Sequence, residues 1–214
     1  MDIWPTVHAE RRALAGDLRA LADEQWATAS LCPGWSVRDV LAHMTSTASL
    51  TPPAFFARLA ARGFSFGKLH EDGIAAHCGA TPADTLAGFE AVLTSVKHPP
   101  GPTQSWLGET IVHGEDIRRP LGIKHGYPAE ALIQIADFYK RSNLLIGSKR
   151  RIAGLALRAT DTDWSHGTGP EVRGPMLSLV MAMTGRKEAA EDLTGDGVTA
   201  LRSRITDNKV SGRR

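Results

Sequence analysis

The stretch Gly108-Glu-Thr-Ile-Val-His-Gly-Glu-Asp-Ile-Arg-Arg-Pro120 carries a carboxylate and an imidazole four residues apart. Side chains at positions i and i+4 of a helix lie on one face, so Glu109 and His113 are expected to point at the same spot. The closing proline ends this helix, which we expect to run from about residue 103 to 119. His43, far upstream, can add a second imidazole from a neighbouring helix. Two imidazoles and one carboxylate form the ligand set of catalytic divalent-metal sites with open positions.

Each of these three residues also has an ordinary interpretation. His43 lies beside an apolar helix stripe and can be a hydrogen-bonded core histidine. A lone Glu-x-x-x-His pattern is common by chance, and Glu109 with His113 can form a surface pair. Both histidines adjoin apolar helix faces, however, where an imidazole without a partner is costly to bury. This burial favours the metal interpretation.

The bulk composition is that of a globular protein. The chain has 214 residues, 42% of them hydrophobic and 22% charged, with a formal net charge of +2. No apolar run is long enough to span a bilayer, and the N-terminus lacks the features of a signal peptide. Two cysteines make no disulfide framework, which favours a reducing cytoplasm. The basic residues are scattered, so we expect no nucleic-acid or membrane partner. We also expect the protein to be a monomer or a homodimer.

The hydrophobic pattern predicts a mainly α-helical protein with a bundle over residues 1–150. Ser36 and Thr81 are expected helix caps, each followed three residues later by an aspartate. A polar, glycine-containing stretch after Gly63 carries no helix signal. The expected helices cover about residues 7–27, 37–51, 54–62, 82–97, 103–119 and 128–144.

A change of pattern after residue 150 predicts a small α+β tail over residues 151–214. Gly154–Thr160 is expected to be a strand, and Trp164–Arg173 resembles a hairpin with its turn at Gly167–Gly169. A short apolar helix is expected over Met176–Met183, and another after the turn at Thr194–Gly197. The remaining histidines show no ligand spacing and are interpreted as surface or loop residues: His8, His70, His98, His125 and His166.

Two segments resemble the signatures of a known family. Leu31-Cys-Pro-Gly-Trp-Ser-Val-Arg-Asp-Val-Leu-Ala-His43 and Glu109-Thr-Ile-Val-His-Gly-Glu-Asp-Ile-Arg-Arg-Pro-Leu-Gly122 are similar to those of the mycothiol-dependent maleylpyruvate isomerases. The tail, from Thr162 through Gly174 and at Met183–Arg186, also resembles that family. The family belongs to the DinB-like metalloproteins, so the resemblance implies a four-helix bundle whose metal ligands are His43, Glu109 and His113.

The resemblance further implies zinc and mycothiol, a low-molecular-weight thiol used by actinobacteria. A thiol that enters the open metal position is deprotonated by the metal, which makes it a nucleophile for a small electrophile. Addition followed by elimination gives an isomerase, and addition alone gives a thiol S-transferase. Isomerases of this family carry an important arginine in a fuller C-terminal domain. We expect a shorter tail here, with Arg173 and Arg186 as the candidate catalytic arginines.

Other residues near the candidate ligands have two interpretations each. Asp116 shares the face of Glu109 and His113, so it can orient an imidazole or act as a base; alternatively, it pairs with Arg119 or Lys124. Arg118 and Arg119 can bind a substrate carboxylate, although cations are ordinary at a helix C-terminus. Trp35 and Trp106 are predicted to line the thiol pocket, with simple core packing as the alternative.

Two rival functions use the same ligands. Two histidines and a carboxylate also hold non-haem iron(II), which would make the protein a thiol-oxidising enzyme. A non-catalytic metal-binding protein is the second rival, and a structural zinc site is normally closed by a fourth protein ligand.

Overall fold

The computed structural model describes residues 2–144 and 146–211. The chain divides into two compact units, Met1–His125 and Gly126–Arg214. Helix α7 (Ala129–Tyr139) thereby falls in the C-terminal unit. The predicted domain boundary at residue 150 stays a prediction.

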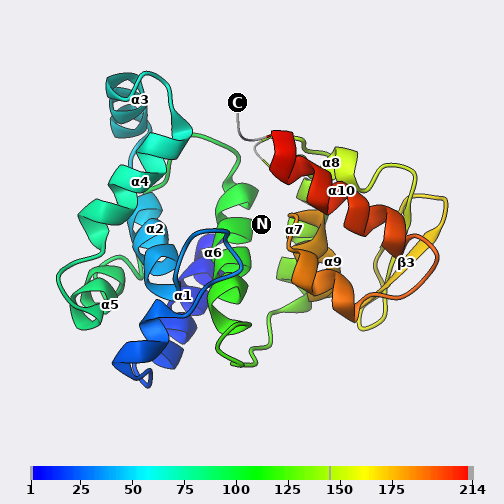
Figure 1. Cartoon of the computed structure of the whole chain (residues 1–214), viewed down its shortest axis with the longest axis horizontal. Coiled ribbons are helices and arrows are strands. Elements are labelled where there is room, and N and C mark those ends of the chain that lie inside the picture. Colours follow the sequence, from blue (N-terminus) through cyan, green and yellow to red (C-terminus); the bar gives the residue numbers. More distant parts are fainter. Residues whose placement is uncertain (1, 145, 212–214) are drawn as a thin grey trace. The chain divides into compact units, whose positions relative to one another are not determined.

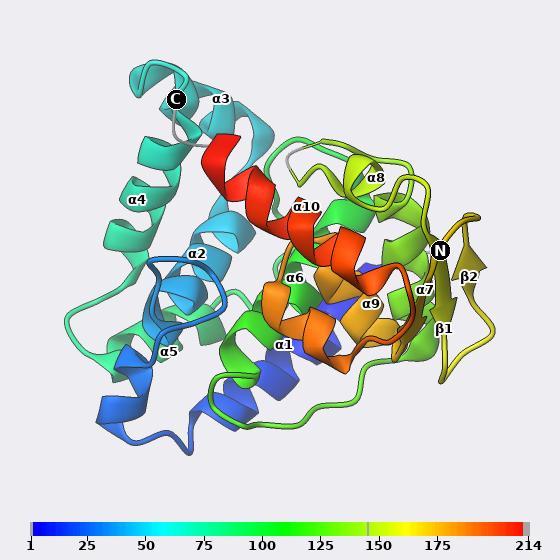
Figure 2. The ribbon, with the colours of Figure 1, turned by 45° about the vertical axis from the view of Figure 1, so that its right-hand side comes forward.

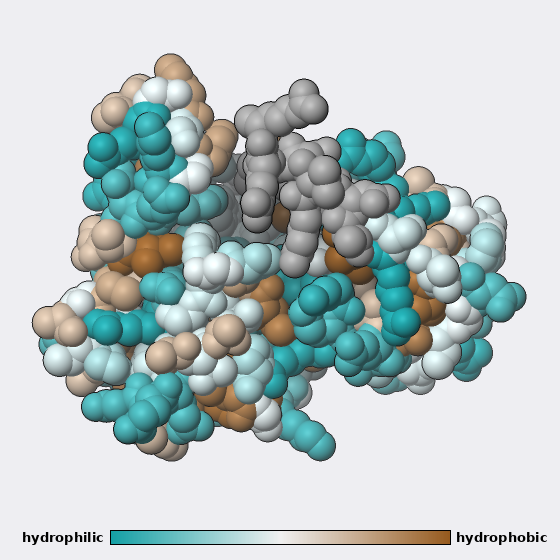
Figure 3. Space-filling model, in the orientation of Figure 1, coloured by the Kyte–Doolittle hydropathy of each residue, from teal (hydrophilic) through white to brown (hydrophobic). Residues whose placement is uncertain are grey.

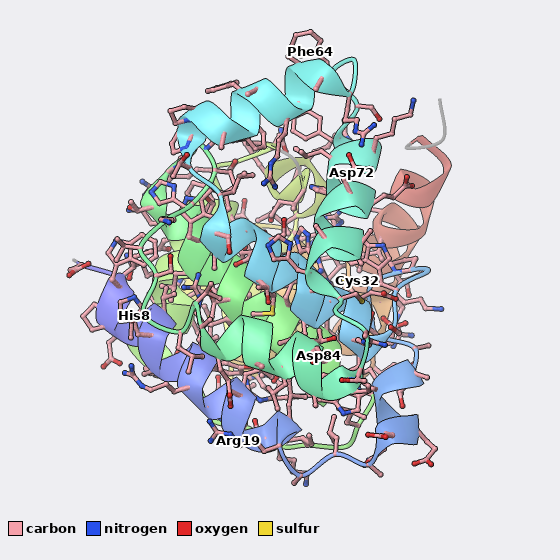
Figure 4. All side chains as sticks on the ribbon, turned by 90° about the vertical axis from the view of Figure 1, so that its left-hand side faces the viewer. His8, Arg19, Cys32, Phe64, Asp72 and Asp84 are labelled. Carbon is pink, nitrogen blue, oxygen red and sulfur yellow. The ribbon has the colours of Figure 1, made fainter. Side chains whose placement is uncertain are left out.

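Four helices of the N-terminal unit form a closed ring of contacts. They are α1 (Trp4–Leu18), α2 (Val37–Ser49), α5 (Pro82–Glu90) and α6 (Thr103–Arg118). Helix α6 packs on α1 and α2, and α5 packs on the same two helices from the other side. This arrangement is a four-helix bundle, and Figure 4 shows it with His8 on α1, Arg19 directly after the end of α1 and Asp84 near the start of α5.

The helix caps expected from the sequence are present. The backbone N–H of Asp39 donates to the Ser36 hydroxyl, and the Asp39 carboxylate accepts from the Ser36 backbone N–H at 2.8 Å. Thr81 and Asp84 form the same reciprocal cap at the start of α5. Such caps satisfy backbone N–H groups that a helix start leaves without a partner. They fix where α2 begins, and therefore where its histidine lies.

The first expected helix is wrong in its length. Helix α1 ends at Leu18, and the short 3-10 helix η1 (Asp23–Ala27) follows as a separate element. Helix α3 (Pro52–Ala61) begins at the two prolines, which occupy the first helical positions, where a missing N–H has no cost.

The polar stretch after Gly63 contains a helix that the sequence did not indicate. Helix α4 (Phe66–His77) packs along α2. A Cβ placed on Gly73 would lie 2.5 Å from the hydroxyl of Ser46, so the glycine permits this close approach. Glycine inside a helix lowers its intrinsic stability, and tertiary packing overrides that preference here.

An apolar core fills the bundle beside the candidate ligands. Its fully buried members come from the bundle helices and include Leu14, Leu18, Val37, Val40, Leu41, Met44, Phe89 and Ile117. On the face shown in Figure 3, polar residues cover most of the N-terminal unit and apolar residues form small groups between them. No helix of the described residues is long and apolar enough to cross a membrane.

The C-terminal unit combines a small sheet with helices (Figure 2). Strand β1 (Ala156–Ala159) pairs antiparallel with β2 (Ser165–His166) and parallel with β3 (Glu171–Gly174), giving the order β2-β1-β3. The expected hairpin over 164–173 is therefore wrong, because β2 and β3 both pair with β1 instead of with each other. Gly167 and Gly169 approach the backbone of Leu155 and Gly154 too closely for any side chain.

Helices complete the C-terminal unit (Figure 1). Helices α7 and α9 (Met176–Met183) pack together, and the unit also contains α8 (Ser148–Arg151), the 3-10 helix η2 (Lys187–Asp192) and α10 (Val198–Ser211). The helix expected over about residues 128–144 ends earlier than predicted, because α7 stops at Tyr139 and Leu144 lies beyond it, 60% exposed.

Candidate metal centre

The bundle brings His43, Glu109 and His113 together. His43 comes from α2, and the other two come from successive turns of α6. One ligand atom from each residue lies within 4.8 Å of the others. The two imidazole rings meet edge to face, with their centroids 5.1 Å apart. A single ion can therefore contact all three side chains after small side-chain adjustments.

Glu109 is the most unusual of the three, because one of its oxygens is buried without a hydrogen-bond partner. This oxygen is Oε1. Burial raises the pKa of Glu109, and the nearby His113 and Arg11 oppose that rise. A buried carboxylate oxygen without a partner costs free energy unless a cation or donor approaches it. The donor set therefore fits a divalent cation.

His113 is held from behind by a carboxylate. Its Nδ1 lies 2.9 Å from Oδ2 of the fully buried Asp116, and the thiol of Cys32 donates to the same oxygen at 3.1 Å. Burial alone lowers the pKa of His113, but its contacts with Asp116 and Cys32 raise that pKa to about 10. With Nδ1 engaged, Nε2 is the nitrogen left for a metal. Of the two interpretations of Asp116, the geometry matches the one that orients an imidazole.

His43 is flanked by two further aromatic rings. Trp35 lies 5.0 Å from it and His70 lies 5.1 Å from it, measured between ring centroids. Burial, together with the neighbouring His113 and His70, holds the pKa of His43 well below its usual range. Burial also lowers the pKa of His70. Trp35 thus lies beside the candidate centre, and its predicted contact with a thiol stays a prediction.

His70 and Cys32 are the two site residues that the sequence interpretation missed. His70 was assigned to the surface or a loop, but it is half-buried on α4 and contacts both Trp35 and His43. Neither residue has a ligand-like spacing that could have revealed it. Cys32 lies inside the first family signature, and only its position in that segment hinted at a role.

Trp106 lies in a different environment from Trp35. Its indole stacks on His98 with the ring centroids 5.4 Å apart, and His98 stacks in turn on Trp4 at 5.7 Å. The Trp106 Nε1 is buried without a hydrogen-bond partner. Its predicted contact with a thiol stays a prediction.

The two arginines at the end of α6 form ion pairs. Arg118 is buried and donates to Asp17 at 2.7 Å, and Arg119 donates to Glu115 at 3.1 Å. Both contacts match the interpretation of these arginines as ordinary helix-end cations that secure the bundle.

The two candidate catalytic arginines belong to the C-terminal unit. Arg173 is exposed on β3, and its backbone exchanges hydrogen bonds with Thr194. Arg186 follows α9 and donates from its side chain to the carbonyl of Thr184 at 3.2 Å. Their predicted roles stay predictions.

The arrangement suits a metal with an accessible position. Among the described residues, the group around His43 contains three ligands and no fourth histidine, cysteine or acid. Each of the three residues keeps partial solvent exposure. Three protein ligands plus an open position characterise catalytic sites, whereas closed sets of four characterise structural ones.

Comparison with known proteins agrees with this fold. The family described as Mycothiol maleylpyruvate isomerase N-terminal domain matches residues 7–118, which is more than half of the 214-residue chain. No curated protein matches the sequence significantly.

Two solved structures share the fold. One is titled as the crystal structure of the mycothiol-dependent maleylpyruvate isomerase, at 15% identity, and the other is a histidine-to-alanine mutant of it, at 14% identity. Both superpose with a TM-score of 0.63, covering 90% of this chain and 91% of the other. Such mutual coverage means chains of similar length, so the expectation of a shortened tail is wrong. The predicted mainly α fold, a helical bundle with a small α+β region, is confirmed, and the chain belongs to the family of the mycothiol maleylpyruvate isomerase N-terminal domain.

Proposed function

We propose that this protein is a zinc-dependent, mycothiol-using enzyme that adds a thiol to a small electrophile. The observation that carries the proposal is the Glu109 carboxylate, which has a buried oxygen without a hydrogen-bond partner and lies within 4.8 Å of a ring nitrogen of each of two histidines. The family supports the thiol, because members named in the comparisons are mycothiol-dependent. The thiols of Cys32 and Cys78 are reduced, which suits a reducing compartment such as the cytoplasm.

The residues of the bundle have different proposed roles at the metal centre. His43, Glu109 and His113 would hold the zinc, and their single negative charge leaves the centre net positive. Bound zinc lowers the pKa of a thiol at the open position and stabilises the thiolate. Asp116 would fix the tautomer and orientation of the His113 ring through its hydrogen bond to Nδ1.

The chemistry that suits such a thiolate is reversible addition to an activated double bond. The sulfur forms a bond to one alkene carbon, and the electron pair of the double bond moves toward the activating carbonyl. Rotation about the resulting single bond and departure of the sulfur restore the alkene with the opposite geometry. If a proton traps the adduct instead, the product is a thioether and the enzyme is an S-transferase.

Four further residues are proposed to contact the small molecules. Trp35, which packs on His43, would line the thiol position, and we retain Trp106 as a second candidate. Arg173 and Arg186 would bind an anionic group of the electrophile, since arginine pairs well with carboxylates. Replacing either arginine by alanine should raise KM without changing the zinc content.

The test measures bound metal and thiol binding in the same preparations. Purified wild-type protein and the His43→Ala variant are analysed for zinc and iron by mass spectrometry, and each is titrated with mycothiol. We expect one zinc per wild-type chain, none in the variant, and mycothiol binding only to the zinc form. Maleylpyruvate with mycothiol then serves as the electrophile, with the trans isomer and the thioether as distinguishable products.

The matched control is His77→Ala, because His77 lies on α4 and hydrogen-bonds the backbone carbonyl of Gly73 away from the ligands. It should keep its zinc. Zinc without mycothiol binding would contradict the proposed thiol chemistry. Bound iron with oxygen consumption would replace it by thiol oxidation, and a wild-type protein that binds no metal would overturn the proposal entirely.

A further inference from the structure

A compact loop precedes α2 and is closed by backbone pairing. Ala29 and Ser36 form an isolated antiparallel bridge across its base. Inside it, the Ser30 N–H donates to the Trp35 carbonyl at 3.0 Å, and the Trp35 N–H donates to the Cys32 carbonyl at 3.1 Å. These bonds hold the side chains of Cys32 and Trp35 in defined places, although neither belongs to a helix.

This loop, residues 29–36, is hydrogen-bonded to Asp116 of α6. The Leu31 N–H donates to the Asp116 backbone carbonyl at 3.1 Å. The Cys32 thiol donates to the Asp116 carboxylate, also at 3.1 Å, and its sulfur lies 3.6 Å from the His113 Nδ1. Cys32 and Asp116 are both buried, so water does not compete for these bonds.

The same loop also reaches the other imidazole. Trp35 packs its ring on His43 with the centroids 5.0 Å apart. The two histidines that converge on the candidate centre are thus supported by one loop from two sides. Figure 4 labels Cys32, which marks this loop beside α2.

Cys32, His113 and Asp116 also satisfy the distances of a second metal-binding group. Two features favour hydrogen bonding instead. The His113 Nδ1 cannot donate to Asp116 and coordinate an ion at once, and all three contacts fall within hydrogen-bond or sulfur-contact range. Outer hydrogen bonds of this kind commonly orient a metal-binding imidazole.

We infer that Cys32 is a positioning residue: its thiol holds the Asp116 carboxylate against the His113 Nδ1, which aims the Nε2 of His113 at the metal. The inference rests on the proposed function, because it concerns the same centre. Cys32 itself contacts neither metal nor substrate in this role. Removing its thiol leaves the three ligands in place but removes one hydrogen bond from the carboxylate that orients one of them.

The test compares Cys32→Ala with Cys32→Ser. Zinc affinity is measured by competition with a chromophoric chelator, and the visible spectrum of the cobalt(II)-substituted protein reports ligand geometry. Cys32→Ala should weaken zinc binding roughly 10-fold, the lower end of the range for outer hydrogen-bond partners, and should alter the cobalt bands. Cys32→Ser keeps an O–H donor and should recover most of the affinity and the wild-type spectrum.

Cys78→Ala is the matched control, because the Cys78 thiol lies 3.9 Å from Asp39, away from the ligands. It should match the wild type in both readouts. Thermal melting of the metal-free proteins separates packing from positioning: a loss of stability shared by Cys32→Ala and Cys32→Ser, without rescue of affinity by serine, would reduce Cys32 to packing.

The outcomes separate this inference from the proposed function. If wild-type protein binds one zinc and Cys32→Ala binds it equally tightly with an unchanged cobalt spectrum, the positioning role is wrong while the zinc centre stands. A second metal equivalent that disappears in Cys32→Ala would overturn positioning in favour of a second metal site. If the wild type binds no metal, the proposed function itself fails.

Discussion

The two units of this protein each bury a charged group, and the neighbours of the two groups differ. In the N-terminal unit, Glu109 leaves a buried oxygen without a partner beside two imidazoles. In the C-terminal unit, the buried Arg151 donates from one terminal nitrogen to the backbone carbonyls of Ile146 and Met183. Arg151 also has one buried atom without a hydrogen-bond partner, its Nε, but only the Glu109 carboxylate belongs to a group of side chains that could hold a cation. A buried polar atom without a partner therefore points to a ligand only where its neighbours can bind the same ligand.

The largest expected effect comes from removing the open carboxylate. Glu109→Gln should weaken zinc binding by more than the ~100-fold that marks the upper end for outer-shell changes, because it removes a direct ligand. The metal-free variant should be at least as stable as the metal-free wild type, since it no longer buries a carboxylate. Chelator competition and denaturant unfolding measure the two quantities.

Glu90→Gln is the control for this variant, because Glu90 forms an ion pair at 2.6 Å with Arg19, whose side chain is largely exposed. It should leave zinc affinity unchanged. A Glu109→Gln protein that keeps wild-type zinc affinity would show that the buried oxygen is not a ligand and would remove the contrast between the two units.

The next largest effect is expected from Asp116, which contacts the His113 Nδ1. Asp116→Asn removes the negative charge that accepts from Nδ1, so zinc affinity should fall by roughly 10–100-fold. Competition titration measures the change. Asp72→Asn provides a comparison, because Asp72 is an exposed acid on α4 that pairs with Arg62 (Figure 4). Equal affinities in the two variants would mean that Asp116 serves only the packing of the bundle.

The buried Arg151 of the C-terminal unit is expected to affect stability and not metal binding. Arg151→Met keeps the length of the side chain but leaves the carbonyl of Met183 without this donor, so unfolding should become easier by about 1–3 kcal/mol. Zinc affinity should stay at the wild-type value. A variant with normal stability and impaired activity would instead give Arg151 a functional role and remove the contrast between the two buried charges.

The features that the sequence predicted depend on neighbouring residues, whereas the features that it missed depend on contacts between distant segments. The spacing of Glu109 and His113 and the capping pair of Ser36 and Asp39 are local patterns, so they can be read from a few neighbouring residues. Helix α4 depends on Gly73, whose use becomes clear only when Ser46 of α2 lies against it. Sheet order is likewise a long-range property, since the parallel pairing of β1 with β3 has no signature in either strand.

The smallest expected effect tests whether His70 completes the centre. His70 approaches His43 as closely as His113 does, with ring centroids 5.1 Å apart in both pairs, but it does not belong to the ligand group. His70→Phe keeps an aromatic ring against Trp35 and His43 while removing both ring nitrogens. Zinc should still bind once per chain, with an affinity change below the ~10-fold expected for an outer hydrogen-bond partner. Loss of zinc as complete as in His43→Ala would identify His70 as a fourth ligand, and a centre closed by four protein ligands is structural and has no position left for a thiol.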